Sequence, residues 1–222
     1  MWCIPEVTPP FIERMEHLLN LYNKQYNPKQ PIVCVDEKSK QLIGSKRKGK
    51  PAKEGKPKKT DYEYQRNGTR NIFLSVEPKA GFRKVKVTKQ RKCSDFAQFI
   101  KELVNLKRFQ KVKKIHIVLD NLNTHFEKSF YETFSKTEAD HILKKIEFHY
   151  TPKHASWLNM AEIEIGIRDR QCLRKRIADK KVLVRNISLW QRERNRHKTK
   201  IDWKFTTQKA REVFKYEPAE LS

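Results

Sequence analysis

The run Ile115-His116-Ile117-Val118-Leu119-Asp120-Asn121-Leu122-Asn123-Thr124-His125 joins a short apolar segment to an abruptly polar end. Nearly continuous Ile, Val and Leu residues are typical of a strand that is buried on both faces. Asp120 follows this predicted strand, at a place where a carboxylate can meet a metal ion or a ligand. An equally good interpretation of the run alone is that Asp120 caps the next helix, because Asp and Asn are favoured N-cap residues.

A second segment repeats this design earlier in the chain. Pro31-Ile32-Val33-Cys34-Val35-Asp36-Glu37 is another short apolar run that ends in acid. If the two predicted strands are neighbours in one sheet, Asp36 and Asp120 emerge at the same edge, where α/β sheets bind their ligands. Carboxylates a few ångströms apart repel each other unless a cation neutralises them, and an all-oxygen site of this kind suits Mg²⁺ or Mn²⁺.

Hydrophobic periodicity predicts the elements around these two strands. Apolar residues at helical spacing predict helices over 11–22, 96–106, 126–134, 157–176, 187–196 and 207–214, and further strands are predicted over 70–77, 82–88 and 146–150. Ser156 is the expected N-cap of the long helix over 157–176. This order of five strands and several helices predicts an α/β fold.

The composition points to a polyanionic partner. The 222 residues include 50 Lys and Arg but only 26 Asp and Glu, which gives a formal net charge of +24. Nucleic acid is the first candidate for such a chain, and a membrane surface is the weaker one. No apolar run has the length of a membrane span, and no signal-peptide pattern is present. The four cysteines lie far apart without a Cys-x-x-Cys pair, which argues against a zinc ribbon and against a disulfide framework.

The positive charge is concentrated in residues 38–60. This segment holds ten Lys or Arg residues and only one acid, Glu54, with Gly and Pro interspersed. It is too polar to form a core of its own, so we expect a mobile loop or an extended arm. Contact with phosphate or with a partner subunit is favoured over a solvated loop without a role. The candidate DNA-binding residues are Lys46, Arg47, Lys48, Lys50, Lys58 and Lys59.

A third carboxylate is available on the predicted helix over 157–176. Glu162 and Glu164 are two positions apart, which corresponds to about 200° of rotation, so only one of them can face the sheet edge. Glu162 borders the apolar stripe that contains Leu158, Ala161 and Ile165, whereas Glu164 borders the opposite apolar side. Helical geometry therefore leans toward Glu162 without deciding between the two.

Three motifs of the chain resemble the signatures of DDE transposases, in the branch of bacterial insertion sequences related to the mariner elements. The motifs are Val35-Asp36-Glu37, the run from Asp120 to His125, and Ser156-Trp157-Leu158-Asn159-Met160-Ala161-Glu162. They occur in the family's order, with 84 positions from Asp36 to Asp120 and 42 from there to Glu162. The resemblance extends from about Trp2 to Pro218 and includes Trp203-x-Phe205.

The resemblance implies a fold and a set of site residues. The fold is an RNase H-like mixed five-stranded sheet flanked by helices, similar to the core of retroviral integrases. The catalytic residues and metal ligands are Asp36, Asp120 and Glu162, where the family's Leu-Asn-x-x-Glu pattern selects Glu162 over its neighbour. Two Mg²⁺ or Mn²⁺ ions are the implied cofactors. Asn121, His125 and Glu164 are candidates for supporting the metal ligands, although a structural role for His125 is an equally good interpretation.

The resemblance also implies DNA cleavage followed by strand transfer, with element ends and target DNA as partners, a homodimeric state and a place beside the nucleoid in the bacterial cytoplasm. The expected organisation is a lead-in and helix over 1–30, a catalytic core over 31–177 with a basic loop over 38–66, and a basic helical extension over 178–222. The helix-turn-helix region usual in this family is absent, so a separate helix-turn-helix subunit is a possible partner. A related nuclease without joining activity and a non-catalytic DNA-binding remnant are the alternatives.

Overall fold

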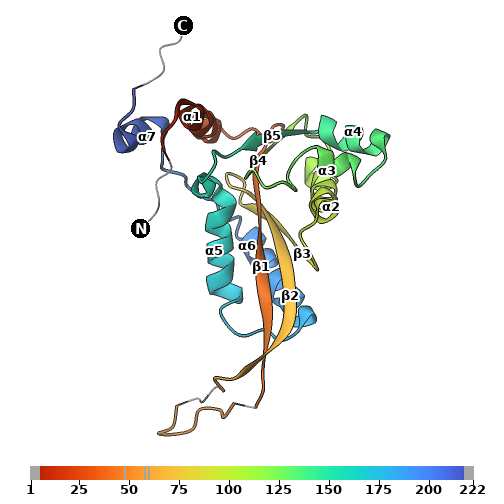
Figure 1. The fold of residues 1–222 in the computed structure, drawn as a ribbon, viewed down its shortest axis with the longest axis vertical. Coiled ribbons are helices and arrows are strands. Elements are labelled where there is room, and N and C mark those ends of the chain that lie inside the picture. Colours follow the sequence, from red (N-terminus) through yellow and green to blue (C-terminus); the bar gives the residue numbers. More distant parts are fainter. Residues whose placement is uncertain (1–5, 48, 58, 60, 218–222) are drawn as a thin grey trace.

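The computed structural model describes residues 6–47, 49–57, 59 and 61–217 (Figure 1). Its centre is one five-stranded sheet with the order β3-β2-β1-β4-β5. The strands are β1 (Ile32–Ser45), β2 (Tyr64–Glu77), β3 (Phe82–Thr88), β4 (Ile115–Leu119) and β5 (Ile146–Tyr150). The first three pair antiparallel and β1, β4 and β5 pair parallel. The predicted α/β fold with a mixed five-stranded sheet is confirmed.

Seven α-helices flank the sheet within the described part of the chain. They are α1 (Pro9–Asn23), α2 (Cys93–Val104), α3 (Lys128–Tyr131), α4 (Lys136–Lys144), α5 (Met160–Cys172), α6 (Lys180–Arg196) and α7 (Thr207–Phe214). α5 packs against β1 and β2, and α6 packs against β3. None of the described helices combines the length and the apolar character that a membrane span requires.

Two apolar cores, one on each face of the sheet, explain the nearly continuous apolar runs of β1 and β4. Successive side chains of a strand point to opposite faces. Val33, Val35 and Ile117 therefore pack with α2, whereas Cys34 and Val118 join the core that contains α1 and α5. The sheet is covered on both sides, as the sequence of its central strands predicts.

The first part of the basic segment, residues 38–45, is an extension of the sheet rather than a loop. β1 continues through Lys38 to Ser45, paired with β2 from Ile72 back to Tyr64, so the predicted loop over 38–66 is wrong at both ends. The two strands together form a long hairpin that projects from the body of the molecule (Figure 1). Backbone pairing with β2 and the burial of Leu42 stabilise this polar strand. Because these contacts are with residues distant in sequence, the composition of the segment does not predict them.

Two predicted helices differ from the observed ones. Only α3 forms within 126–134, and α4 was not predicted because Ala139 and Ile142 are its only buried side chains. The long helix begins at Met160 and ends at Cys172, inside the predicted range of 157–176. Ser156 is not its N-cap, because residues 156–158 form a separate 3₁₀ turn and Asn159 caps the helix.

Candidate active site

Asp36 and Asp120 lie side by side where two parallel strands separate. Asp36 was predicted to end a strand, but it lies inside β1, which continues to Ser45. β1 pairs with β4 from Ile32 to Cys34, which lies opposite Val118, and β4 ends one residue later. Continuing this register by two positions places Asp36 beside Asp120. Beyond this point β1 keeps only β2 as its neighbour, which opens the sheet edge at the two carboxylates.

The start of α5 brings a third carboxylate to the same place. Asp36 shares a sheet face with Cys34, which packs in the same core as Ala161 of α5. The side chain of Asn159 fixes the helix start, because its Nδ2 donates to the carbonyl of Val35 at 2.8 Å and its Oδ1 accepts from the N–H of Ala161 at 3.1 Å. Glu162 follows in the first turn and is exposed. The capping role of Asn159 was not predicted, although Asn directly before a helix is a recognised capping signal.

The charges of the three carboxylates act on one another. Burial, followed by the negative charges of Glu162, Glu37 and Asp120, raises the pKa of Asp36 to about 8, against the effect of one backbone hydrogen bond. Asp36, Asp120 and Glu162 do not form a group in which one carboxylate oxygen from each residue lies within 4.8 Å of the other two. The charges of Glu162 and Asp120 nevertheless act on Asp36, and a divalent cation between these carboxylates would remove their mutual repulsion.

The hydrogen bonds of the two aspartates leave oxygens free for such a cation. Oδ1 of Asp36 accepts from the N–H of Glu37 at 2.7 Å. Oδ1 of Asp120 accepts from the N–H of Leu122 at 3.2 Å and lies 2.6 Å from Nδ1 of His125. In both residues these bonds use Oδ1 alone, so Oδ2 can face an ion. The residues present thus fit a hard, oxygen-preferring ion such as Mg²⁺ or Mn²⁺.

His125 links two acids beneath the site. Its fully buried ring places Nδ1 at 2.6 Å from Oδ1 of Asp120 and Nε2 at 3.0 Å from Oε2 of Glu37. Burial lowers the pKa of His125, but the two hydrogen bonds and the two negative charges outweigh burial and raise it to about 9. The imidazolium donates to both carboxylates, and it lowers the pKa of Asp120 against the effect of burial. His125 thereby fixes the orientation of the Asp120 carboxylate.

Two of the predicted supporting residues lie elsewhere. Glu164 is completely buried, and its two oxygens accept hydrogen bonds from Arg83 on β3 at 2.9 Å and from Arg194 on α6 at 2.9 and 3.1 Å. Asn121 instead donates to the carbonyl of Thr151 and accepts from Arg14 at 3.4 Å. Neither side chain contacts the three carboxylates. The occupied oxygens of Glu164 leave Glu162 as the third carboxylate.

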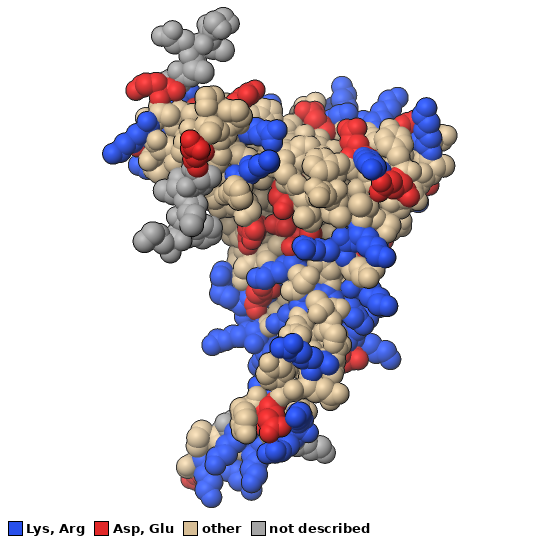
Figure 2. Space-filling view, in the orientation of Figure 1, with Lys and Arg blue, Asp and Glu red and all other residues tan. Residues whose placement is uncertain are grey.

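Of the predicted DNA-binding residues, Lys46, Arg47, Lys50 and Lys59 lie on the hairpin, and Lys48 and Lys58 fall outside the described residues. Lys46 and Arg47 form ion pairs with Glu63 at 3.2 and 3.4 Å, and Lys50 pairs with Lys59 through the backbone. Figure 2 shows Lys and Arg side chains over the tip of the hairpin and over the middle of the molecule, beside an acidic patch. The positive surface therefore reaches from the arm to the body of the protein.

Comparisons with known proteins identify a family and a fold. Residues 31–184 match a sequence family described as DDE superfamily endonuclease. Among solved structures, the chain is similar to a Mos1 transposase paired-end complex with left transposon end, at a TM-score of 0.60 and 15% identity over 90% of this chain and 62% of that chain. A Mos1 mariner paired-end complex with Mn gives 0.56 and 16%, over 90% of this chain and 62% of that one. A Mos1 strand transfer complex gives 0.53 and 16%, over 90% and 61%.

These likenesses confirm the RNase H-like fold that the sequence motifs imply. The chain spans about three fifths of the length of the Mos1 chains. No curated protein matches it in sequence.

Proposed function

The chain belongs to the DDE endonuclease superfamily, and from this membership we propose that it is the catalytic domain of a transposase that cuts and joins the ends of an insertion sequence. The observation that carries the proposal is that Asp36 lies in β1 beside the end of β4, which Asp120 follows, while Asn159 ties the helix of Glu162 to β1. The similarity to a Mos1 strand transfer complex supports the joining step.

We propose that Asp36, Asp120 and Glu162 are the metal ligands and that they hold two divalent ions, Mg²⁺ or Mn²⁺. When bound, the ions supply an activated attacking oxygen and neutralise charge on the leaving oxygen. His125 keeps Oδ1 of Asp120 in place so that Oδ2 faces the site. Asn159 anchors the first turn of α5 to β1 and thereby positions Glu162. A Mos1 complex with Mn agrees with this choice of ion.

The proposed reaction has two steps at the same site. Hydrolysis breaks the bond between phosphorus and the 3′-oxygen at the element end, which leaves a 3′-hydroxyl and a 5′-phosphate. The 3′-oxygen then attacks a phosphorus of target DNA and displaces the target's own 3′-oxygen, so one phosphodiester forms as another breaks. Both steps place negative charge beside the carboxylates, and nearby Lys and Arg side chains neutralise the phosphates.

We propose that the basic hairpin contacts DNA or a partner subunit. In this assignment Lys46, Arg47, Lys50 and Lys59 are phosphate-binding residues, together with Lys48 and Lys58. The same proposal includes a homodimer and a separate helix-turn-helix subunit that reads the element ends. It also includes a place beside the nucleoid and a division of the chain into residues 1–30, 31–177 and 178–222. The +24 net charge and the mariner-type fold support it.

Replacing Asp120 tests the assignment. We expect Asp120→Asn to abolish Mg²⁺-dependent cleavage and joining of element-end DNA, measured on gels that resolve nicked and joined products. Asp202→Asn removes an exposed carboxylate that is distant in sequence from the three candidate ligands, and it serves as the matched control. Activity retained in the Asp120 variant would refute the assignment. Cleavage without joined products would indicate a nuclease of the same fold, and salt-sensitive DNA binding without any cleavage would indicate a non-catalytic remnant.

A further inference from the structure

A second group of metal-ligating side chains lies on the same face of the sheet, away from the three carboxylates. His116 on β4 pairs with Glu147 on β5, and His149 follows two residues later, so the period of the strands places all three side chains on one face. Among the described residues they form the only group of three His, Cys, Asp or Glu whose ligand atoms all lie within 4.8 Å of one another. His116 is four residues before Asp120, which corresponds to about 13 Å along the strand.

We propose that His116, Glu147 and His149 form a binding site for a transition-metal ion of the Zn²⁺ type, which fastens α1 to the β4–β5 edge of the sheet. The proposal is independent of the DNA chemistry proposed above. Two imidazoles and a carboxylate are a donor set that zinc takes in proteins, whereas Mg²⁺ prefers oxygen ligands alone.

The distances between the donor atoms suit one ion. Nδ1 of His116 lies 2.9 Å from Nε2 of His149, and the Glu147 carboxylate oxygens lie 3.6 Å and 3.5 Å from these two nitrogens. A tetrahedral zinc with bonds of about 2.0 Å separates its ligands by about 3.3 Å. These distances involve one Glu147 oxygen each, and a single donor atom from each residue lies within 4.8 Å of the other two, so the three can form one face of such a tetrahedron after small movements of the side chains.

The hydrogen bonding around His149 can leave its Nε2 without a hydrogen, so that this nitrogen can bind a metal. Nδ1 of His149 lies 2.8 Å from Nε2 of His17 on α1, and the two rings stack with centroids 5.1 Å apart. When Nδ1 donates its hydrogen to His17, Nε2 carries none and keeps a lone pair that points toward His116 and Glu147. Metal-ligating histidines are held in this way by a partner on the other ring nitrogen. His17 thus connects α1 to the site.

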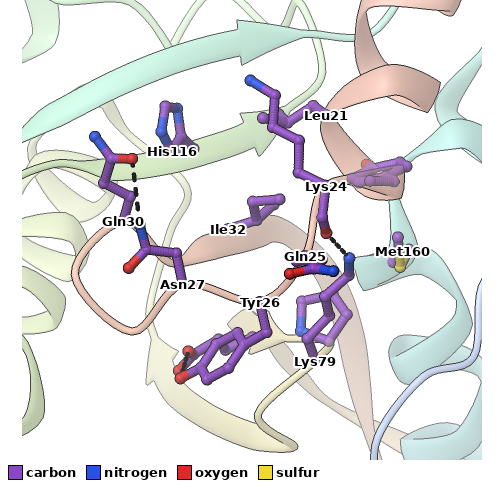
Figure 3. Close-up of a pocket in the computed structure, with 13 residues that line it drawn as sticks. Leu21, Lys24, Gln25, Tyr26, Asn27, Gln30, Ile32, Lys79, His116 and Met160 are labelled. Atoms are coloured by element: carbon purple, nitrogen blue, oxygen red, sulfur yellow. Dashed lines mark hydrogen bonds between the residues drawn. The ribbon is translucent and has the colours of Figure 1, made fainter.

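An ion has access to the site from two sides. His116 lines a cavity of about 160 Å³ between α1 and the sheet, where Figure 3 shows it near Ile32 and Lys24. His17 and His149 line a second cavity of about 280 Å³ on the other side. The Glu147 side chain is half exposed, at 49%. A metal can therefore enter and exchange without unfolding of the sheet edge.

Co²⁺ binding to the full chain tests the site, because tetrahedral Co²⁺ absorbs visible light and reports its own geometry. The measurement uses the Asp120→Asn variant, in which the carboxylate site is impaired, with excess Mg²⁺ present. We expect one equivalent of Co²⁺ to bind with a tetrahedral spectrum and Zn²⁺ to displace it. Zn²⁺ should also raise the melting temperature and slow hydrogen exchange in α1, since binding to the folded state stabilises that state.

Variants separate this site from general binding to histidines. Glu147→Gln changes a half-exposed side chain and preserves the fold, and we expect it to weaken Co²⁺ binding more than tenfold, as should His149→Ala. His141→Ala removes an exposed imidazole on α4 and should leave binding unchanged. The proposal is overturned if no tetrahedral spectrum develops, if Mg²⁺ suppresses it, or if Glu147→Gln and His149→Ala bind Co²⁺ as tightly as the parent. None of these outcomes depends on cleavage or joining of DNA.

Discussion

His125 shows how one buried side chain organises the candidate active site. Its ring bridges Asp120 and Glu37, and the side chain of Glu37 is only 4% exposed. A buried carboxylate without a partner is unfavourable, because it has lost its hydration without receiving a compensating charge. The imidazolium thus contributes to the stability of the fold as well as to the orientation of Asp120.

Replacing His125 should therefore reduce stability. We expect His125→Ala to lower the free energy of unfolding by about 3 kcal/mol, because it leaves the buried Glu37 carboxylate with only the exposed Arg91 guanidinium, 3.8 Å from its Oε1, as a partner. Urea denaturation followed by circular dichroism measures this change. His141→Ala, which removes an exposed imidazole, should change stability by less than about 0.5 kcal/mol. Equal unfolding midpoints for the two variants would contradict the bridging role of His125.

Glu164 is the second decisive single residue, because it accepts hydrogen bonds from two arginines in the interior. The Arg83 side chain is fully buried with it, and Arg194 is 15% exposed. Burial acts to raise the pKa of Glu164, but the hydrogen bonds and charges of the arginines prevail and lower it. A carboxyl whose pKa is lowered on folding stabilises the protein above its unfolded-state value and loses this contribution as the pH falls through the folded-state value.

Glu164→Gln should accordingly change how stability depends on pH. At pH 7 we expect a loss of about 3–5 kcal/mol, because the buried Arg83 and the partly buried Arg194 lose their anion. The difference in stability between the variant and the parent should shrink as the pH falls below about 4.5, because Glu164 of the parent is then protonated and is neutral like the Gln side chain. Urea midpoints between pH 3 and pH 7 measure this. The exposed Glu13→Gln is the control, and a difference that stayed constant with pH would argue against the ion-pair account.

At the scale of elements, the start of α5 determines where Glu162 stands. Asn159 both caps this helix and holds the backbone of β1, so one amide joins the helix carrying the third carboxylate to the strand carrying the first. Glu162 has no such tether of its own and depends on the position of the helix. A small change at the cap is therefore expected to reach the active site.

Asn159→Ala tests this dependence. Loss of the cap should lower stability by about 1–2 kcal/mol, and the shifted helix start should reduce Mg²⁺-dependent cleavage at least tenfold. Ser135→Ala removes the N-cap side chain of α4, which lies on the other face, and should lower stability without affecting cleavage. Equal cleavage by the two variants under conditions in which both are folded would show that Asn159 does not position Glu162.

At the scale of the whole molecule, the hairpin of β1 and β2 carries positive charge away from the body (Figures 1 and 2). Glu63 neutralises part of this charge through ion pairs with Lys46 and Arg47, and Asp61 accepts a hydrogen bond from the backbone N–H of Arg47. Exposed ion pairs of this kind contribute little to stability and exchange readily for phosphate contacts. The arm can therefore bind an anion without any loss to the fold.

Neutralising the arm distinguishes its two candidate partners. Changing Lys46, Arg47, Lys50 and Lys59 to Gln should weaken DNA binding and reduce the slope of log affinity against log salt by up to about 3–4. Fluorescence anisotropy at several salt concentrations measures the slope, and ultracentrifugation measures the oligomeric state. A control variant changes four exposed lysines outside the arm, at positions 111, 113, 136 and 144, to Gln. An unchanged salt slope together with loss of self-association would assign the arm to a partner subunit.

The sequence alone determined the identity of the central strands, the two aspartates and the helix that carries Glu162. These features are local: apolar runs fix β1 and β4, a periodic stripe fixes α5, and the three motifs follow the family's order. Helical geometry alone did not decide between Glu162 and Glu164, and the motif resemblance was needed to select Glu162.

The tertiary structure decided everything that depends on contacts between distant residues. Asp36 lies beside the end of β4 because β4 ends where β1 continues, and the sequence of one strand does not reveal the length of the other. Glu164 became a core residue through Arg83 and Arg194, which lie 81 and 30 positions away. The group of His116, Glu147 and His149 likewise exists only because two strands pair and α1 brings His17 beside them. Burial periodicity is a property of single elements, whereas ion pairs and metal sites arise from their packing.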